Sequence, residues 1–265
     1  MNCDALLQGP GGLHRMRAPD GRPAVVKIRR DAPCGFFEAE ARGLAALAAS
    51  RTLRVPNVLA VSASGIALED LGAGRPGRAD WQRAGAALAR MHAVAFDRFG
   101  FDTNGWCGDS PQDNTRDVDG PRFFAERRLQ PQVARAAACG LIDANDRRAL
   151  DRICDRLADL IPPAPPALVH GDLWTANLHA CANGELTLID AGAVHHGWAE
   201  ADLAMLTLFG EPPPSFFAAY ETESRTDASW RERAPLYNLY HLLNHLNLFG
   251  AGYLGAVRAV LRRYG

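Results

Sequence analysis

Three polar residues near the middle of the chain have the types and spacing that phosphoryl transfer requires. Asp172 is followed five positions later by Asn177, and Asp190 ends an alternating polar and apolar segment, Glu185 to Ile189. In phosphoryl transfer one carboxylate orients the attacking hydroxyl, while an amide and a second carboxylate hold Mg²⁺ against the nucleotide phosphates. The spacing therefore predicts a catalytic base at Asp172 and magnesium ligands at Asn177 and Asp190.

The same stretch has a purely structural alternative, because Asp and Asn also favour tight turns between strands. The turn residues Ala182 to Gly184 and the alternation after them are typical of a β-hairpin that would end at Asp190. A hairpin accounts for one Asp but not for the complete set of three residues. We therefore favour the catalytic interpretation, as a hypothesis that needs its structural context.

Lys27 is the only lysine in the chain, and every other basic residue apart from histidine is arginine. Lysine offers a compact ammonium on a flexible stem, whereas arginine presents a planar guanidinium. The apolar run Ala24 to Ile28 around Lys27 matches the kinase strand whose lysine contacts the nucleotide phosphates. We predict that Lys27 binds phosphate; the alternative is a lone exposed lysine on a strand.

A helix expected over Gly35 to Ala49 supplies an acidic partner for this lysine. Glu40 lies three positions after Phe37 and four before Leu44, so it should share their inward face. Glu38 is the alternative partner, but its position suits an ordinary solvated pair on the surface. We therefore predict that Glu40 pairs with the lysine.

Two further segments are candidates for ATP binding. Gly11 and Gly12, one strand before Lys27, could cover the phosphates with backbone N–H groups. An ordinary turn is an equal alternative, because Gly and Pro clusters mark turns and a proline has no N–H. Glu69 and Leu71 lead into a Gly- and Pro-rich linker, and we expect the backbone here to lie beside the adenine.

The order of patterns along the 265 residues predicts an α+β protein with two lobes. Residues 1–71 alternate strand patterns with one helix, which predicts a small β-rich nucleotide-binding lobe. Residues 72–79 form the linker, and residues 80–265 form a mainly helical lobe with the catalytic loop and substrate site. In that lobe Pro121 should open one helix and Asp143 should cap another.

Bulk properties exclude several classes of function. The net charge is −1 and basic residues form no cluster, so we expect no nucleic-acid partner. No apolar run reaches the ~18 residues of a membrane span, and the first residues lack the features of a secretion signal. We expect a cytoplasmic monomer without a membrane partner.

The cysteines and histidines give no sequence signal for a metal site. The six cysteines lack any CxxC spacing, which argues against a zinc site or a disulfide framework. His195 and His196 are adjacent and therefore diverge, so we expect them exposed in a loop. His241 and His245 are four apart on a helical pattern, but no third ligand is evident and packing is favoured.

With these residues in hand, the chain resembles the fructosamine kinase family, also called ketosamine kinases, within the aminoglycoside phosphotransferase-like branch of the protein kinase fold. The likeness covers nearly the whole chain. The segments that carry it are His170-Gly171-Asp172-Leu173-Trp174-Thr175-Ala176-Asn177, Glu200-Ala201-Asp202-Leu203-Ala204-Met205 with Leu208-Phe209-Gly210, and Phe123-Phe124-Ala125-Glu126-Arg127-Arg128-Leu129. One departure is that Asp190 is followed by Ala191, where the family usually has Pro.

The resemblance implies a two-lobed protein kinase-like fold and a reaction that needs ATP and Mg²⁺. The acceptor would be a sugar hydroxyl of a ketosamine, either a small molecule or protein-bound, and the phosphorylated adduct would then leave the amine. It gives Asp172, Asn177, Asp190, Lys27 and Glu40 the roles stated above. Trp174 would stack on the sugar or its amine, with packing beneath the loop as the open alternative.

Two other functions remain compatible with these residues. The chain could phosphorylate an aminoglycoside or a choline-like alcohol by the same chemistry. It could instead be a pseudokinase that binds nucleotide without turnover. The second alternative is disfavoured, because a protein that only binds nucleotide has no need of a base at Asp172.

Overall fold

The computed structural model describes residues 3–226 and 228–265. The described residues divide into two compact units, each assembled from several chain segments. The first unit draws on Met1–Met91, Thr175–Val194 and Pro212–Thr226, and the second on His92–Trp174, His195–Glu211 and Asp227–Gly265. The predicted catalytic segment is therefore divided between the units, at the junction of Trp174 and Thr175.

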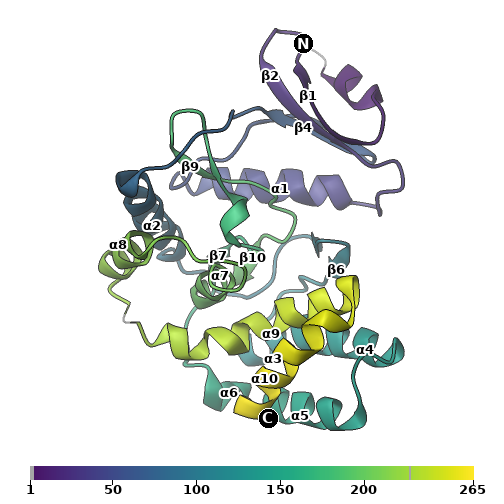
Figure 1. The fold of residues 1–265 in the computed structure, drawn as a ribbon, viewed down its shortest axis with the longest axis vertical. Coiled ribbons are helices and arrows are strands. Elements are labelled where there is room, and N and C mark those ends of the chain that lie inside the picture. Colours follow the sequence, from purple (N-terminus) through teal and green to yellow (C-terminus); the bar gives the residue numbers. More distant parts are fainter. Residues whose placement is uncertain (1–2, 227) are drawn as a thin grey trace. The chain divides into compact units, whose positions relative to one another are not determined.

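The first unit contains a four-stranded antiparallel sheet in the order β1-β2-β4-β3. Its strands are β1 (Gly12–Arg17), β2 (Pro23–Ile28), β3 (Val58–Ser62) and β4 (Gly65–Glu69), preceded by the 3₁₀ helix η1 (Asp4–Gln8). Helix α1 (Phe36–Ala49) lies along one side of the sheet and packs against β3 and β4 (Figure 1). Phe37 and Leu44 are buried as predicted, and this packing holds α1 where the inward-facing Glu40 can meet strand β2.

Two helices and a hairpin complete the first unit. Helices α2 (Arg78–His92) and α8 (Pro214–Ser224) lie side by side (Figure 1), and a Cβ at Gly85 would overlap the carbonyl of Phe216. The short 3₁₀ helix η3 (Thr175–Asn177) leads into β8 (Leu178–Ala180), which pairs with β9 (Leu186–Leu188). The N–H of Gly184 closes the predicted turn by donating to the Cys181 carbonyl at 2.8 Å.

The second unit is mainly helical. Helix α9 (Trp230–Phe249) packs against α4 (Gln130–Ala138), α7 (Ala199–Met205) and α10 (Leu254–Tyr264), and it also contacts the π-helical η2 (Ala125–Leu129) and the 3₁₀ helix η4 (Ala251–Tyr253). The remaining helices are α3 (Gly120–Phe124), α5 (Ala144–Asp155) and α6 (Leu157–Leu160). Two short strand pairs accompany them, β5 (Gly105–Cys107) with β6 (Ser110–Gln112) and β7 (Ala167–Val169) with β10 (His195–Gly197).

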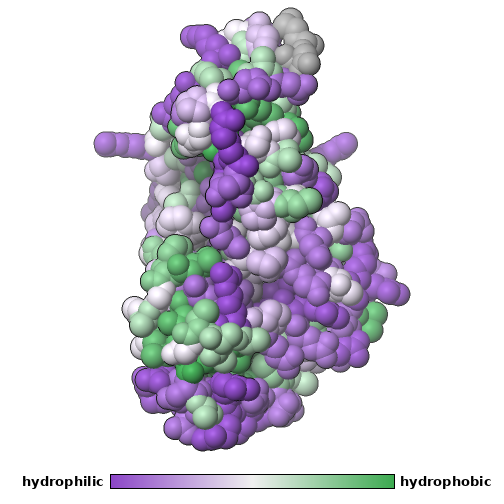
Figure 2. Space-filling view, turned by 90° about the vertical axis from the view of Figure 1, so that its right-hand side faces the viewer, coloured by the Kyte–Doolittle hydropathy of each residue, from purple (hydrophilic) through white to green (hydrophobic). Residues whose placement is uncertain are grey.

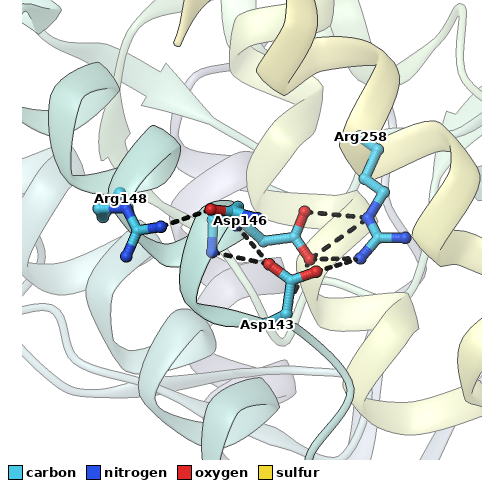
Figure 3. A network of polar contacts seen from close by, with 5 residues as sticks. Asp143, Asp146, Arg148 and Arg258 are labelled. Carbon is cyan, nitrogen blue, oxygen red and sulfur yellow. Dashed lines mark hydrogen bonds and ion pairs between the residues drawn. The ribbon is translucent and has the colours of Figure 1, made fainter.

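Asp143 caps α5 as predicted and also ties it to α10. Its carboxylate accepts from the N–H groups of Asn145 and Asp146 at 2.7 and 3.0 Å, and it faces Arg258 together with Asp146 (Figure 3). We expect Asp143→Ala to lower the free energy of unfolding by about 1 kcal/mol, the usual effect of losing such a cap. Chemical denaturation would measure this, with the exposed Arg148→Ala as a control that should change stability by less than about 0.5 kcal/mol.

The prediction that His195 and His196 are exposed in a loop is wrong. Both lie in β10, paired with β7, and are only 8% and 7% exposed. The His196 ring stacks on Phe96 with centroids 3.7 Å apart, and burial lowers the pKa of His196. The local sequence is not apolar enough to predict a buried strand here, because its burial comes from pairing with a distant segment.

The outer surface mixes residue types. On the face drawn in Figure 2, hydrophobic residues gather in patches between hydrophilic ones. The large exposed hydrophobic side chains of the second unit include Trp174, Phe209 and Phe249. In the part of the chain that the structure describes, no helix is both long enough and apolar enough to cross a membrane.

Candidate active site

Lys27, Glu40 and Asp190 come together in the first unit, from β2, α1 and the segment after β9. The Lys27 Nζ donates to Glu40 Oε1 at 2.7 Å and also to Asp190 Oδ1. Glu40 is 6% exposed, and a buried carboxylate needs a cationic partner to offset its lost hydration. Burial opposes the charge of Lys27, but the two carboxylates outweigh it and raise its pKa, so the ammonium is protonated at neutral pH. Glu40, rather than Glu38, is thus the partner that the structure provides.

The hairpin β8–β9 carries both predicted magnesium ligands at its open end. Asn177 directly precedes β8 and is buried, and its carbonyl accepts from the N–H of Ile189 at 3.2 Å. Asp190, the next residue, has φ of +59°, a left-handed conformation that costs a non-glycine residue roughly 1–3 kcal/mol and is often found at functional sites. Carboxylate and amide oxygens are hard donors of the kind that Mg²⁺ prefers, so this pair fits the ion.

Helix α1 comes close to the Asp190 segment at Gly43. A Cβ at Gly43 would overlap the carbonyl oxygen of Ala191 and lie 3.1 Å from the Ala191 Cβ. Gly43 is three positions after Glu40, so both residues lie on neighbouring parts of the same helix face. The helix that holds Glu40 is therefore in backbone contact with the residue that follows Asp190.

We expect Gly43→Ala to lower turnover by roughly 10- to 100-fold, because overpacking strain of ~1–3 kcal/mol would separate α1 from the Asp190 segment. Thermal unfolding should change less, since alanine favours a helix interior over glycine by about 1 kcal/mol. The matched control is Gly255→Ala in α10, where a Cβ would meet nothing within 4 Å. Steady-state kinetics on both variants would measure the effect, and a folded Gly43→Ala enzyme with normal turnover would show that this contact does not position the site.

The glycines predicted to cover the phosphates lie beside the lysine strand. Gly12 opens β1 with φ of +119°, a conformation that glycine adopts without strain. In the β1–β2 pair Gly12 lies opposite Ile28, and Leu13 lies opposite Lys27. Gly11 and Gly12 are thus at the end of the strand pair that presents the ammonium group.

The predicted adenine segment lies at the end of β4. The Glu69 carboxylate accepts from Arg54 Nη2 at 2.6 Å and from Asn57 Nδ2 at 2.8 Å. The Leu71 carbonyl accepts from the Ala182 N–H at 3.0 Å. These bonds fix the segment within the first unit, and its contact with adenine stays a prediction.

In the second unit, Asp202 holds the loop that leads to Asp172. Its two carboxylate oxygens accept from the N–H groups of His170 and Gly171, at 2.7 and 2.9 Å. Asp202 is 1% exposed, and His92 Nε2 lies 3.3 Å from its Oδ2. Burial alone would raise the pKa of Asp202, but the hydrogen bond and charge of His92, with those of His170, lower it. Asp202 therefore fixes the backbone of the loop that leads to Asp172.

Asp172 and Trp174 lie on this loop with their side chains partly accessible. The Asp172 side chain is 26% exposed, and its Oδ1 lies 3.8 Å from His241 Nδ1. Trp174 is 37% exposed, and its ring meets Phe209 edge to face with centroids 6.4 Å apart. Trp174 therefore packs on one ring and keeps surface for a ligand. The neighbour His241 was missed by sequence reasoning, because nothing in the sequence connects it with Asp172.

Comparison with known proteins agrees with this arrangement. The sequence profile of the fructosamine kinase family matches residues 13–264. A Synechocystis protein named as a ketoamine kinase is 37% identical over 243 residues, which are 90% of this chain and 81% of that protein. The chloroplastic protein-ribulosamine 3-kinase of Arabidopsis thaliana is 35% identical over 258 residues, which are 92% of this chain and 77% of the plant protein.

Solved structures give the same result. A structure from Thermobifida fusca, named as a candidate fructosamine-3-kinase, has a TM-score of 0.88 and 38% identity, over 94% of this chain and 88% of that one. The ADP-bound aminoglycoside phosphotransferase APH(2'')-Ib has a TM-score of 0.61 at 15% identity, a likeness of fold alone. The predicted α+β fold of the protein kinase-like class is confirmed by these neighbours. Since the family profile and these relatives each match most of its length, the chain belongs to the fructosamine kinase family.

Proposed function

We propose that this protein is an ATP-dependent kinase that phosphorylates a sugar hydroxyl of a ketosamine, such as a fructosamine or ribulosamine. Phosphorylation then leads to release of the sugar from the amine. The observation that carries the proposal is the contact of Lys27 with both Glu40 and Asp190, in a chain that belongs to the fructosamine kinase family. A buried acid, the only lysine and a strained aspartate have no evident reason to meet in a protein that does not handle phosphate.

Each of these residues has a separate task in the proposed reaction. Lys27 neutralises charge on the transferred phosphate, and Glu40 holds the ammonium in place. Asn177 and Asp190 would hold Mg²⁺, which supplies further charge neutralisation when bound. Asp172 orients the acceptor hydroxyl and takes its proton as the oxygen bonds to phosphorus and ADP leaves. Trp174 stacks on the sugar or its amine.

The alternative functions are less well supported. The likeness to aminoglycoside phosphotransferases is one of fold, at 15% identity, and it gives no information on the acceptor. A pseudokinase would need neither the base at Asp172 nor the bonds by which Asp202 holds the loop before it. The match of the family profile to residues 13–264 favours a ketosamine over an aminoglycoside as the acceptor.

ADP release with a panel of acceptors would test the proposal. We expect turnover that needs Mg²⁺ with ribulosamine or fructosamine, either free or on a glycated protein, and a phosphorylated sugar detected by ³¹P NMR. Comparing free with protein-bound acceptors would also define the carrier. Turnover only with aminoglycosides or choline would replace the ketosamine assignment, and nucleotide binding without turnover on any acceptor would favour the pseudokinase.

A further inference from the structure

A thiol, an imidazole and the Asp172 carboxylate converge in the second unit from three distant segments. The Cys107 Sγ lies 3.9 Å from His241 Nδ1, and that nitrogen lies 3.8 Å from Asp172 Oδ1. One possible ligand atom from each residue lies within 4.8 Å of the other two. Cys107 and His241 have no part in the proposed phosphoryl transfer, so their position beside the base needs its own explanation.

The three donor atoms suit Zn²⁺. In a tetrahedral zinc site, sulfur lies about 2.3 Å and nitrogen or oxygen about 2.0–2.2 Å from the ion, which puts ligand atoms roughly 3–4 Å apart. The observed spacings of 3.8 and 3.9 Å are already within that range. Thiolate and imidazole donors favour zinc over Mg²⁺, which prefers oxygen, so this cluster is chemically distinct from the Asn177 and Asp190 pair.

The protonation state of His241 already suits metal binding, whereas Cys107 must first lose a proton. Burial, with the charges of His245 and Arg128, lowers the pKa of His241 to about 3, so its imidazole is neutral at physiological pH. A neutral imidazole keeps one ring nitrogen unprotonated, so it can bind a metal ion in the tautomer that leaves Nδ1 unprotonated, without losing a proton to solvent. Burial and the charge of Asp172 raise the pKa of Cys107, so the thiol is protonated before the ion arrives. Binding therefore breaks the S–H bond and releases that proton to solvent.

Asn244 is buried against the thiol of this cluster. It is 1% exposed, and its Nδ2 lies 3.4 Å from the Cys107 Sγ and donates to the Cys107 carbonyl at 3.1 Å. Its Oδ1 is buried with no hydrogen-bond partner among the described residues. A buried acceptor in that condition destabilises a fold by about 1–3 kcal/mol. The hydrogen bond from the Asn244 Nδ2 favours the thiolate form of Cys107, which is the form that binds a metal ion, whereas the buried Arg128 guanidinium opposes a second positive charge.

We propose that Cys107, His241 and Asp172 form an inhibitory Zn²⁺ site. The ion would bind the carboxylate that orients the acceptor hydroxyl, so the base could no longer take the hydroxyl proton. The inhibitory part rests on the proposed function, because that function makes Asp172 the base. Since Lys27, Asn177 and Asp190 take no part in this site, zinc should block turnover without competing with ATP.

Cobalt absorption on the full-length chain, without nucleotide, tests the binding directly. Co²⁺ added to the protein should give the near-ultraviolet charge-transfer band of a thiolate ligand, and Zn²⁺ should remove it. The measurement uses a background in which the exposed Cys34 and Cys139 are both replaced by serine. We expect Cys107→Ser to abolish the band and His241→Gln to weaken it. The matched control is Cys181→Ser, another buried free thiol, which should keep the band.

Inhibition at buffered free Zn²⁺ concentrations tests the consequence. Loss of a residue that only hydrogen-bonds to a metal ligand weakens metal binding by roughly 10- to 100-fold. Cys107→Ser removes a ligand itself, so it should raise the half-inhibitory zinc concentration by about 100-fold or more. Its activity without zinc should match that of the parent. No cobalt band in the parent, or equal zinc sensitivity in Cys107→Ser, would overturn the proposal. The band needs no substrate, so it decides the site even if ketosamines prove not to be acceptors.

Discussion

Asp172→Asn is expected to lower kcat by roughly 100-fold or more, the scale of losing general-base catalysis, while nucleotide affinity stays nearly unchanged. Asparagine has the shape of aspartate but cannot take the proton of the attacking hydroxyl. The loop should keep its conformation, because Asp202 holds it through the backbone of His170 and Gly171 and not through the Asp172 side chain. The nucleotide contacts are assigned to other residues, so ADP should bind as before.

Kinetics with a saturating ketosamine and calorimetric titration with ADP would measure the two expectations separately. Asp97→Asn is the matched control, because its side chain is 83% exposed and its ion pair with Arg98 is long, at 4.0 Å. A normal kcat in Asp172→Asn would remove this residue from the role of base. Loss of ADP binding together with kcat would instead indicate that the substitution disturbs the loop.

Local sequence signals were sufficient to predict most of the fold that positions the site. The caps and turns at Pro121, Asp143 and Gly184 lie where expected, because each depends on the chemistry of a few adjacent residues. The contact of Lys27 with Glu40 could also be predicted, since helix periodicity fixes which acidic residue faces inward. Signals of this kind need no knowledge of how distant segments meet.

Contacts between distant segments could not be predicted in this way. The burial of His195 and His196 comes from pairing with β7, and the approach of Gly43 to Ala191 comes from packing. In the same way His241 lacked a third ligand in the sequence, yet the structure puts Cys107 and Asp172 beside it. A spacing search finds metal ligands on one helix or loop, and it misses ligands that only tertiary structure assembles.

Lys27 is the second residue whose replacement should have a large effect. We expect Lys27→Arg to lower kcat by roughly 100- to 1,000-fold, the usual effect of losing a group that stabilises transition-state charge. The charge would remain, but a planar guanidinium cannot replace a compact ammonium that contacts Glu40 at 2.7 Å and Asp190 at the same time. Kinetics with varied ATP at a saturating acceptor concentration would place the loss in kcat rather than in the KM for ATP.

A double variant separates the catalytic effect of this lysine from its effect on stability. Lys27→Met alone should also lower the free energy of unfolding, because it leaves the buried Glu40 carboxylate without its cation. Breaking a fully buried ion pair costs about 3–5 kcal/mol. We expect a smaller loss here, because the Lys27 side chain is 26% exposed. Adding Glu40→Gln removes the unpaired charge, so stability should recover while turnover stays low. Recovery of turnover along with stability would mean that the ammonium only supports the fold.

Because the chain has a single lysine, mass spectrometry after amine acetylation reports on this site directly, and ATP with Mg²⁺ should protect it. An acetylation rate unaffected by nucleotide would contradict phosphate binding by Lys27.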